Sequence, residues 1–315
     1  PAYVEKVEGA LVEALRRARA EARRARPFAG MTRSRLPVSR RRPNAQGNIE
    51  FKPNPSGEVC AALPFCLFKD DAGAVAALLF SVSCHPSTTF SHDISADFPG
   101  AAVAALNRHF NTPGAIFLQG CGGDAKPSVN VQGGERWRQN DWADVEAAGR
   151  LVAEEVVAGV AGAREVTPEI RTALFDIEFP LQCVPDRRAL ESVNNIRQTP
   201  WAEDMLRRLE FLGHLPNQAP VSIHAIQIGR GLRLIGLEAE ANAPIGNRIL
   251  AAFPEGVTFP LGYSDGVQLY LPDDRQLAEG GYEAECAWEY HWPAPLAGGI
   301  DARLAEALCA LKDRG

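Results

Sequence analysis

The stretch Val75-Ala-Ala-Leu-Leu-Phe-Ser-Val-Ser-Cys84 decides the fold class, and His85-Pro86 follows it directly. An uncharged run of this kind, rich in Val, Leu and Phe, is typical of a strand buried on both faces of a sheet. Residues 96–110 predict a helix, with Pro99 in its first turn. A buried strand followed by a helix is typical of an α/β fold.

The alternation of helices and strands continues along most of the chain. Further strands are predicted at residues 115–118, 172–181 and 257–262, and a hairpin at residues 223–237. Further helices are predicted at residues 3–26, 142–160, 240–252 and 301–312. Loops are predicted at residues 43–58 and 262–281. We therefore expect an α/β fold with a mixed β-sheet core and flanking helices, in a single domain over residues 1–315.

Composition excludes several classes of protein. Apolar residues make up 46% of the 315 residues and charged residues 23%, as in globular rather than disordered or collagen-like chains. The longest apolar run, residues 72–84, is shorter than the roughly 20 residues that span a bilayer, so no transmembrane segment is expected. Seven cysteines without a C-x-x-C pair argue against a disulfide framework and a cysteine zinc cluster.

Positive charge is concentrated near the start of an acidic chain. The net charge is −6, yet eleven arginines and one acid, Glu21, lie between Arg16 and Arg42. Such a segment is either a nucleic-acid or membrane-surface patch or a solvated face whose arginines pair with acids elsewhere. No aromatic residues alternate with the arginines of the helix, which favours the solvated face and predicts no nucleic-acid partner.

Three places join a predicted strand to a polar loop, where α/β proteins hold their sites. His85 ends the first strand, and it suits a metal ligand or general base as well as a structural histidine. The loop Gly120-Cys121-Gly122-Gly123 follows another strand, and the amides around Gly122 and Gly123 could line an oxyanion site. Lys126 beyond this loop is either a surface lysine or a site residue. Glu238 and Glu240 stand at the third strand end.

Several short motifs occur together in one order. They are Cys84-His85-Pro86, Ile94-Ser-Ala-Asp-Phe-Pro-Gly100, Gln119-Gly-Cys-Gly-Gly-Asp-Ala-Lys-Pro127, Gly262-Tyr-Ser264, Tyr270-Leu-Pro272 and Glu279-Gly-Gly-Tyr-Glu283. Jointly they resemble the neutral, non-lysosomal ceramidases, over roughly residues 3–292. The resemblance implies the α/β fold of the ceramidase catalytic domain and hydrolysis of an amide bond.

The resemblance also implies a zinc ion, Zn2+, as cofactor. Members of that family hold one zinc with two histidines, a glutamate and a tyrosine. Matching the motifs assigns the second histidine to His85, the glutamate to Glu240 and the tyrosine to Tyr270, and it puts Tyr282 near the reacting group. Imidazole, carboxylate and phenolate are all acceptable zinc ligands.

Two departures from the family pattern qualify this expectation. The first metal histidine of the family lies in an H-T-H-S string before the first helix, and this sequence holds no such string. We expect either a trimmed N-terminal segment or an incomplete site, and weaker zinc binding with only His85, Glu240 and Tyr270. Lys126 stands where the family has its catalytic serine, in Gly123-Asp124-Ala125-Lys126-Pro127. Asp124 and Lys126 are therefore candidate catalytic residues, with Lys126 an oxyanion donor or a ligand for a substrate carboxylate or phosphate. No immunoglobulin-like domain is expected after the catalytic domain.

Three functions remain open from sequence. The first is a zinc-dependent hydrolase of an amide or ester bond, acting on a small-molecule or lipid-like substrate other than ceramide. The second is a non-catalytic binding or structural module that has lost metal and nucleophile. The third is an anion-binding protein that uses the Gly120–Gly123 loop and the arginine face. The sequence predicts neither an oligomeric state nor a compartment.

Overall fold

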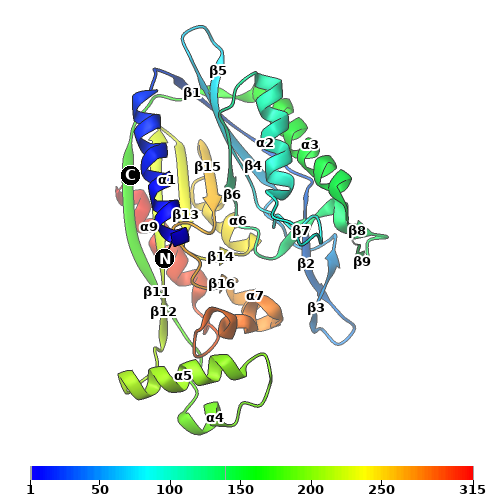
Figure 1. Cartoon of the computed structure of the whole chain (residues 1–315), viewed down its shortest axis with the longest axis vertical. Helices are drawn as coiled ribbons and strands as arrows, with labels where there is room; N and C mark the ends of the chain where they lie inside the picture. The colour runs from blue at the N-terminus through cyan, green and yellow to red at the C-terminus, as the bar shows by residue number, and fades with distance from the viewer. Residues whose placement is uncertain (1, 139, 315) are drawn as a thin grey trace.

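The computed structural model describes residues 2–138 and 140–314 (Figure 1). Pro1 and Gly315, the two ends of the predicted domain, lie outside these ranges. The predicted α/β class is confirmed. Within the described residues the predicted mixed sheet consists of two main sheets, each with parallel and antiparallel pairs, because the apolar strands divide between two hydrophobic cores.

The first sheet contains the strand that decided the fold class. Its order is β10 (Arg164–Glu165), β1 (Arg26–Arg33), β4 (Ala62–Lys69), β5 (Val75–Val82) and β6 (Ala115–Gln119). Only β5 and β6 pair in parallel, and the chain between them forms the crossover helix α2 (Asp97–Phe110) that parallel pairing requires. Helix α3 (Trp142–Gly159) packs beside α2 on the same face (Figure 1).

The second sheet has the order β11 (Arg171–Pro180), β12 (Gln218–Gly229), β13 (Leu232–Leu237) and β15 (Val257–Leu261). The predicted hairpin is β12 and β13, and helix α6 (Ala243–Ala252) connects β13 to its parallel neighbour β15. Helices α6 and α9 (Ile300–Arg314) cover one face of this sheet. Its other face packs on the first sheet, so the main layers are helices, sheet, sheet and helices.

Alternation along β4 shows how one strand serves two layers. Phe65 and Leu67 join the core under α2 and α3, whereas Cys66 joins the cluster between the sheets. This is the two-residue period of a strand with apolar contacts on both faces. The isolated bridge between Gly120 and Leu261 joins the ends of β6 and β15. The loops after the strands of both sheets therefore meet at one place.

Short elements surround that place. They are β2 (Pro37–Pro43), β3 (Ile49–Asn54), β7 (Ala125–Pro127), β8 (Val131–Gln132), β9 (Arg136–Trp137), β14 (Glu240–Ala241), β16 (Tyr270–Leu271), α7 (Asp274–Glu279), α8 (Tyr282–Glu285) and the 3-10 turns η1 (Ser128–Asn130) and η3 (Cys286–Tyr290). The predicted loops at residues 43–58 and 262–281 are therefore wrong in part. Strand β3 forms a hairpin with the adjacent strand β2, whereas β16 pairs with β14 from another part of the chain, a contact that local sequence does not signal.

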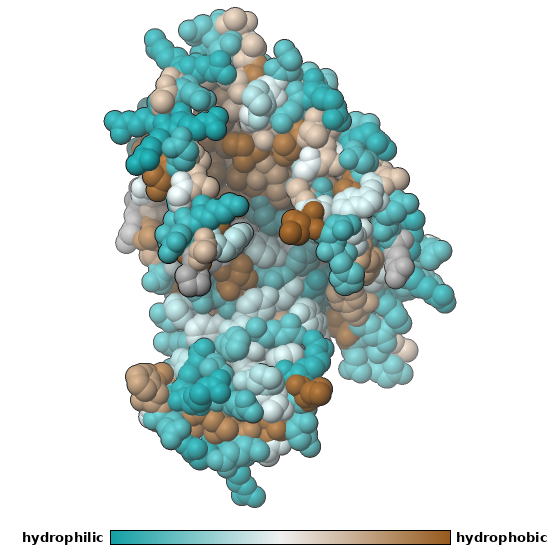
Figure 2. Space-filling view, in the orientation of Figure 1, coloured by the Kyte–Doolittle hydropathy of each residue, from teal (hydrophilic) through white to brown (hydrophobic). Residues whose placement is uncertain are grey.

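The remaining elements are peripheral. The 3-10 turn η2 (Val160–Gly162) follows α3, and helices α4 (Arg187–Glu191) and α5 (Thr199–Leu212) share a small separate apolar cluster. The first helix, α1 (Ala2–Ala20), ends six residues before the predicted Arg26, where β1 begins. It has no buried residue. Figure 2 shows the face hollowed between α1 and the region of α2. Among the described residues, no helix has the length and apolarity to cross a membrane.

Candidate functional site

Strand ends bring the three predicted metal ligands together. His85 follows β5, and Glu240 pairs directly with Tyr270 because β14 and β16 run parallel. His85 Nε2 lies 3.0 Å from Glu240 Oε1, with only 17% and 10% of the two side chains exposed. The Tyr270 hydroxyl is close enough to Glu240 to lower the pKa of that carboxyl. Residues far apart in sequence thus form one largely buried polar cluster.

This donor set fits a zinc ion in part. Zinc–ligand distances of about 2.0–2.1 Å at tetrahedral angles put donor atoms roughly 3.3 Å apart, close to the distance between His85 and Glu240. Among the described residues, no group of three or more His, Cys, Asp and Glu side chains could hold a metal. Tyr270 is the third available donor here. Burial raises the pKa of its hydroxyl, and the Arg40 cation opposes that rise by favouring phenolate.

Two further tyrosines, to which sequence reasoning assigned no role, fix the orientation of the histidine and glutamate. Tyr290 donates a hydrogen bond to Glu240 Oε2 at 2.6 Å. The Tyr263 hydroxyl lies 3.4 Å from His85 Nδ1, and Tyr263 has a left-handed φ of 54°, which non-glycine residues adopt rarely. Burial alone would raise the pKa of Glu240, but hydrogen bonds from His85, Tyr270 and Tyr290 lower it. The carboxylate is therefore held in its charged form.

The Nε2 atom of His85 also lies 3.0 Å from the carbonyl oxygen of Gly123. An imidazole that donates to these oxygens carries its proton on Nε2. A metal ion can bind there only after displacing that proton. A metal ion would thus compete with the proton that His85 Nε2 shares with these oxygens.

A buried ion-pair network stands behind Tyr270. Arg40 Nη2 donates to the Tyr270 hydroxyl at 3.0 Å, and Arg40 Nε lies 2.7 Å from Glu283 Oε1. Arg41 Nη1 lies 2.6 Å from the second oxygen, Glu283 Oε2. One carboxylate on α8 thus fastens two neighbouring arginines of β2. Sequence reasoning missed this network, because Arg40 and Glu283 are 243 residues apart and neither segment predicts a contact with the other.

The glycine loop has a packing role. A Cβ on Gly122 would lie 2.3 Å from Cys84 N, and one on Gly123 would lie 2.6 Å from Asn242 Oδ1. The Gly123 amide donates to Ala241 O at 2.9 Å, so this amide has an internal partner and is not free to bind an oxyanion. Of the predicted pair, only Gly122 stays a prediction as an oxyanion donor.

Asp124 is fully engaged by its neighbours. Its Oδ1 accepts a hydrogen bond from Ala243 N at 2.8 Å, and its Oδ2 accepts one from Gln276 Nε2 at 2.7 Å. Burial raises the pKa of Asp124, and these hydrogen bonds oppose the rise. The contacts fasten β7 to α6 and α7. They favour a positioning role over the predicted catalytic role.

Lys126 and Tyr282 both lie near Arg40: the Arg40 guanidinium is 5.6 Å from the Tyr282 ring centroid, and it shares the Phe51 ring with Lys126. Lys126 is 7% exposed, so it is a buried residue and not a surface lysine. Tyr282 is 43% exposed, and its ring centroid is 5.6 Å from that of Tyr270. Its hydroxyl donates to Glu289 Oε2 at 2.9 Å. The catalytic roles of Lys126 and Tyr282 stay predictions.

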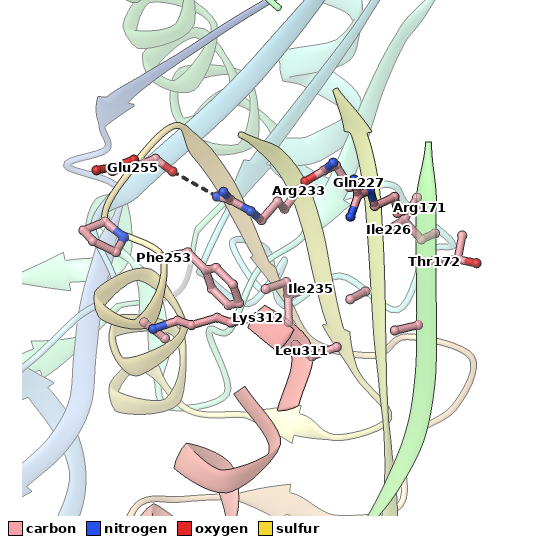
Figure 3. A pocket seen from close by; sticks show the side chains of 14 residues that line it. Arg171, Thr172, Ile226, Gln227, Arg233, Ile235, Phe253, Glu255, Leu311 and Lys312 are labelled. Atoms are coloured by element: carbon pink, nitrogen blue, oxygen red, sulfur yellow. Dashed lines mark hydrogen bonds between the residues drawn. The ribbon is translucent and has the colours of Figure 1, made fainter. Parts of the chain in front are cut away.

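A separate cavity of about 350 Å³ lies on the second sheet (Figure 3). Strands β11, β12 and β13, the end of α6 and the end of α9 line it. Arg233 Nη1 donates to the carbonyl oxygen of Glu255 at 2.9 Å, and both Arg233 and Lys312 lie over the Phe253 ring. No predicted site residue lines this cavity.

Known proteins resemble this chain in structure. No protein-family model and no curated protein matches the sequence. Among solved structures, neutral ceramidase from Pseudomonas aeruginosa superposes with a TM-score of 0.68 at 18% identity, over 96% of this chain and 55% of that chain. A ceramidase complexed with C2 superposes with a TM-score of 0.65 at 18% identity, over 95% and 55%. The chain thus spans little more than half of each ceramidase, and it shares their fold.

Proposed function

We propose that this chain, which shares the fold of neutral ceramidase over almost its whole length, is a zinc-dependent hydrolase that cleaves an amide or ester bond. The observation that carries the proposal is the 3.0 Å contact between His85 Nε2 and Glu240 Oε1, with Tyr270 paired to Glu240 across β14 and β16. These are three donors of the kinds zinc accepts, and His85 and Glu240 lie at a spacing one ion can bridge.

The proposed residues have distinct tasks. His85, Glu240 and Tyr270 would hold the metal, while Tyr290 keeps the Glu240 carboxylate oriented. Arg40 holds the Tyr270 hydroxyl. When bound, zinc would supply Lewis-acid polarisation of a carbonyl and activation of water.

Tyr282 is the candidate hydrogen-bond donor to substrate. Of the two tyrosines whose rings contact Tyr270, Tyr282 and Tyr290, it is the more exposed, and a phenol there could donate to a carbonyl oxygen that gains negative charge. To do so it must exchange its present acceptor, Glu289, for the substrate.

Metal analysis tests the proposal directly. The chain is dialysed against zinc, and zinc is then measured by elemental analysis, with hydrolysis followed on p-nitrophenyl esters and N-acyl amino acids. His85→Ala and Glu240→Gln are each expected to lose at least about tenfold in zinc affinity, the size of effect seen when a ligand or its support is removed. They should lose hydrolysis in parallel.

Matched controls separate the site from general effects. Glu238→Gln changes the other glutamate of the same segment, which bonds to Gln268, and His214→Ala changes an exposed histidine. Both should retain zinc and turnover. Wild-type protein that binds no stoichiometric zinc, or a His85→Ala variant that hydrolyses at the wild-type rate, would contradict the proposal and favour a non-catalytic module.

A further inference from the structure

Lys126 is a buried cation without a matching carboxylate. Lys126 is 7% exposed. Among the described residues, no ion pair joins it to an acid. The carboxylate of Asp97 influences the pKa of Lys126 only at longer range. The Asp97 carboxylate accepts hydrogen bonds from the amides of Thr88, Thr89 and Phe98. A buried ammonium usually has a paired anion.

A second cation stands on the same face of the small sheet. Lys126 pairs with Val38 across β7 and β2, and Arg40 is two residues further along β2. Two residues along a strand return to the same face, so Lys126 and Arg40 are diagonal neighbours. Arg40 shares its one carboxylate, Glu283, with Arg41. Glu279 also lies 3.2 Å from Arg41, so the two arginines have two carboxylates between them, and Lys126 is the cation that no ion pair neutralises among the described residues. Burial lowers the pKa of Lys126, and the positive charge of Arg40 lowers it further.

Aromatic rings surround the ammonium. Lys126 Nζ lies 5.2 Å from the ring centroid of Phe90, 5.7 Å from Trp137 and 5.9 Å from Phe51. Aromatic faces favour the charged form of an amine, which supports an ammonium over a neutral nucleophile. Phe51 and Phe90 are 51% and 52% exposed, so the ring of aromatic residues is open to solvent and offers apolar surface to a ligand.

The ammonium is also tied to the proposed metal site. The amide of His85 donates to the carbonyl oxygen of Ala125, the neighbour of Lys126, at 3.0 Å. Arg40 bridges the two places, since it bonds to Tyr270 and shares the Phe51 ring with Lys126. A ligand held by Lys126 would therefore lie beside His85 and Tyr270.

We propose that Lys126, with the rings of Phe51, Phe90 and Trp137, forms a subsite for an anionic group of the substrate, a carboxylate or a phosphate monoester attached to an apolar moiety. This rests on the proposed hydrolase function and names its substrate class. An anion there neutralises the charge of Lys126 and offsets the repulsion between Lys126 and Arg40. The apolar part of the ligand covers the exposed rings.

Calorimetric titration of the metal-stripped full chain tests the subsite without requiring turnover. The probes are N-benzoylglycine, its neutral carboxamide and phenyl phosphate, so that charge and the kind of anion vary while the aromatic group is kept. We expect at least one anion to bind at least about tenfold more tightly than the carboxamide, since charge-assisted hydrogen bonds contribute about that much. The tighter anion identifies carboxylate or phosphate as the natural group.

Variants locate the effect. Lys126→Met should weaken binding of the preferred anion by at least about tenfold, whereas Lys126→Arg should stay within about threefold, because it keeps the charge. Lys69→Met is the matched control, since Lys69 Nζ lies over the Phe28 ring away from the site. Lys312→Met tests the separate cavity, which Lys312 lines. Both should bind as wild type does.

Several results would overturn the subsite. These are equal binding of anion and carboxamide, unchanged binding by Lys126→Met, loss of binding by Lys312→Met, and no binding of either anion by wild type at millimolar concentration. Thermal melting shows whether each variant is folded. If Lys126→Met does not fold, Lys126→Arg still tests the subsite. Failure here leaves the zinc and ester-hydrolysis measurements untouched, so the two proposals can fail separately.

Discussion

Two groups of arginines lie in the same basic segment and have opposite surroundings. Arg17 on α1 is 70% exposed and lies 3.8 Å from Glu21 one turn away. Arg40 and Arg41 on β2 are 7% and 4% exposed and share Glu283 at 2.7 and 2.6 Å. The charge and residue type are the same, so the difference lies in burial. The comparison shows that a basic run in a sequence can contain both a solvated face and a structural centre.

Burial changes what each ion pair contributes. An exposed pair gains little, because water and salt screen its charges. A buried arginine loses its hydration, and the loss must be offset by a partner with good geometry. The Arg41 guanidinium meets this need with Glu283, Glu279 and the carbonyl oxygen of Gly280. Removing one partner from the buried network should therefore cost far more than removing an exposed one.

The largest expected effect follows from Glu283→Gln. This change leaves two buried arginines without their shared negative charge, and loss of a buried partner costs about 3–5 kcal/mol of unfolding free energy. Urea denaturation followed by circular dichroism measures it. Glu279→Gln is the control, because Glu279 is 33% exposed and Arg41 keeps Glu283. If Glu283→Gln lowers the free energy of unfolding by less than about 1 kcal/mol, the expected difference between the buried and the exposed arginines is contradicted.

An intermediate effect is expected from acid. Burial alone would raise the pKa of Glu283, but the charges of Arg40 and Arg41 hold it below the ordinary value. A lowered folded pKa gives stability that is complete above the unfolded pKa of about 4.3 and is lost as the pH falls through the folded value. The stability gap between wild type and Glu283→Gln should therefore narrow between about pH 5 and pH 3. A constant gap would show that the carboxylate charge is not the cause.

The smallest effect is expected from Arg17→Ala. The Arg17–Glu21 pair is exposed, and such substitutions usually change stability by less than about 0.5 kcal/mol. The same urea measurement, repeated at high salt, should show no further change. A loss comparable with that of Glu283→Gln would mean that α1 is held by contacts that its exposure does not reveal.

Sequence reasoning reached the main elements because their signals are local. The uncharged run at β5, the helix at α2 and the hairpin of β12 and β13 all appear where they are predicted. Strand β3 pairs with the adjacent β2, but the prolines, asparagines and glycines of residues 43–58 predicted a loop there. The short strand β16 was not predicted, since its partner β14 comes from another part of the chain. The same limit hid Arg40, which looked like one more member of a basic run.

The apolar period of the strands and helices is enough to predict the α/β class, and the motifs are enough to single out His85, Glu240 and Tyr270. Folding brings these three side chains together, buries Lys126 among aromatic rings and pairs Glu283 with Arg40 and Arg41. The physical reason is range. Periodicity and turn chemistry act between near neighbours, whereas burial and ion pairing depend on which distant strands lie side by side.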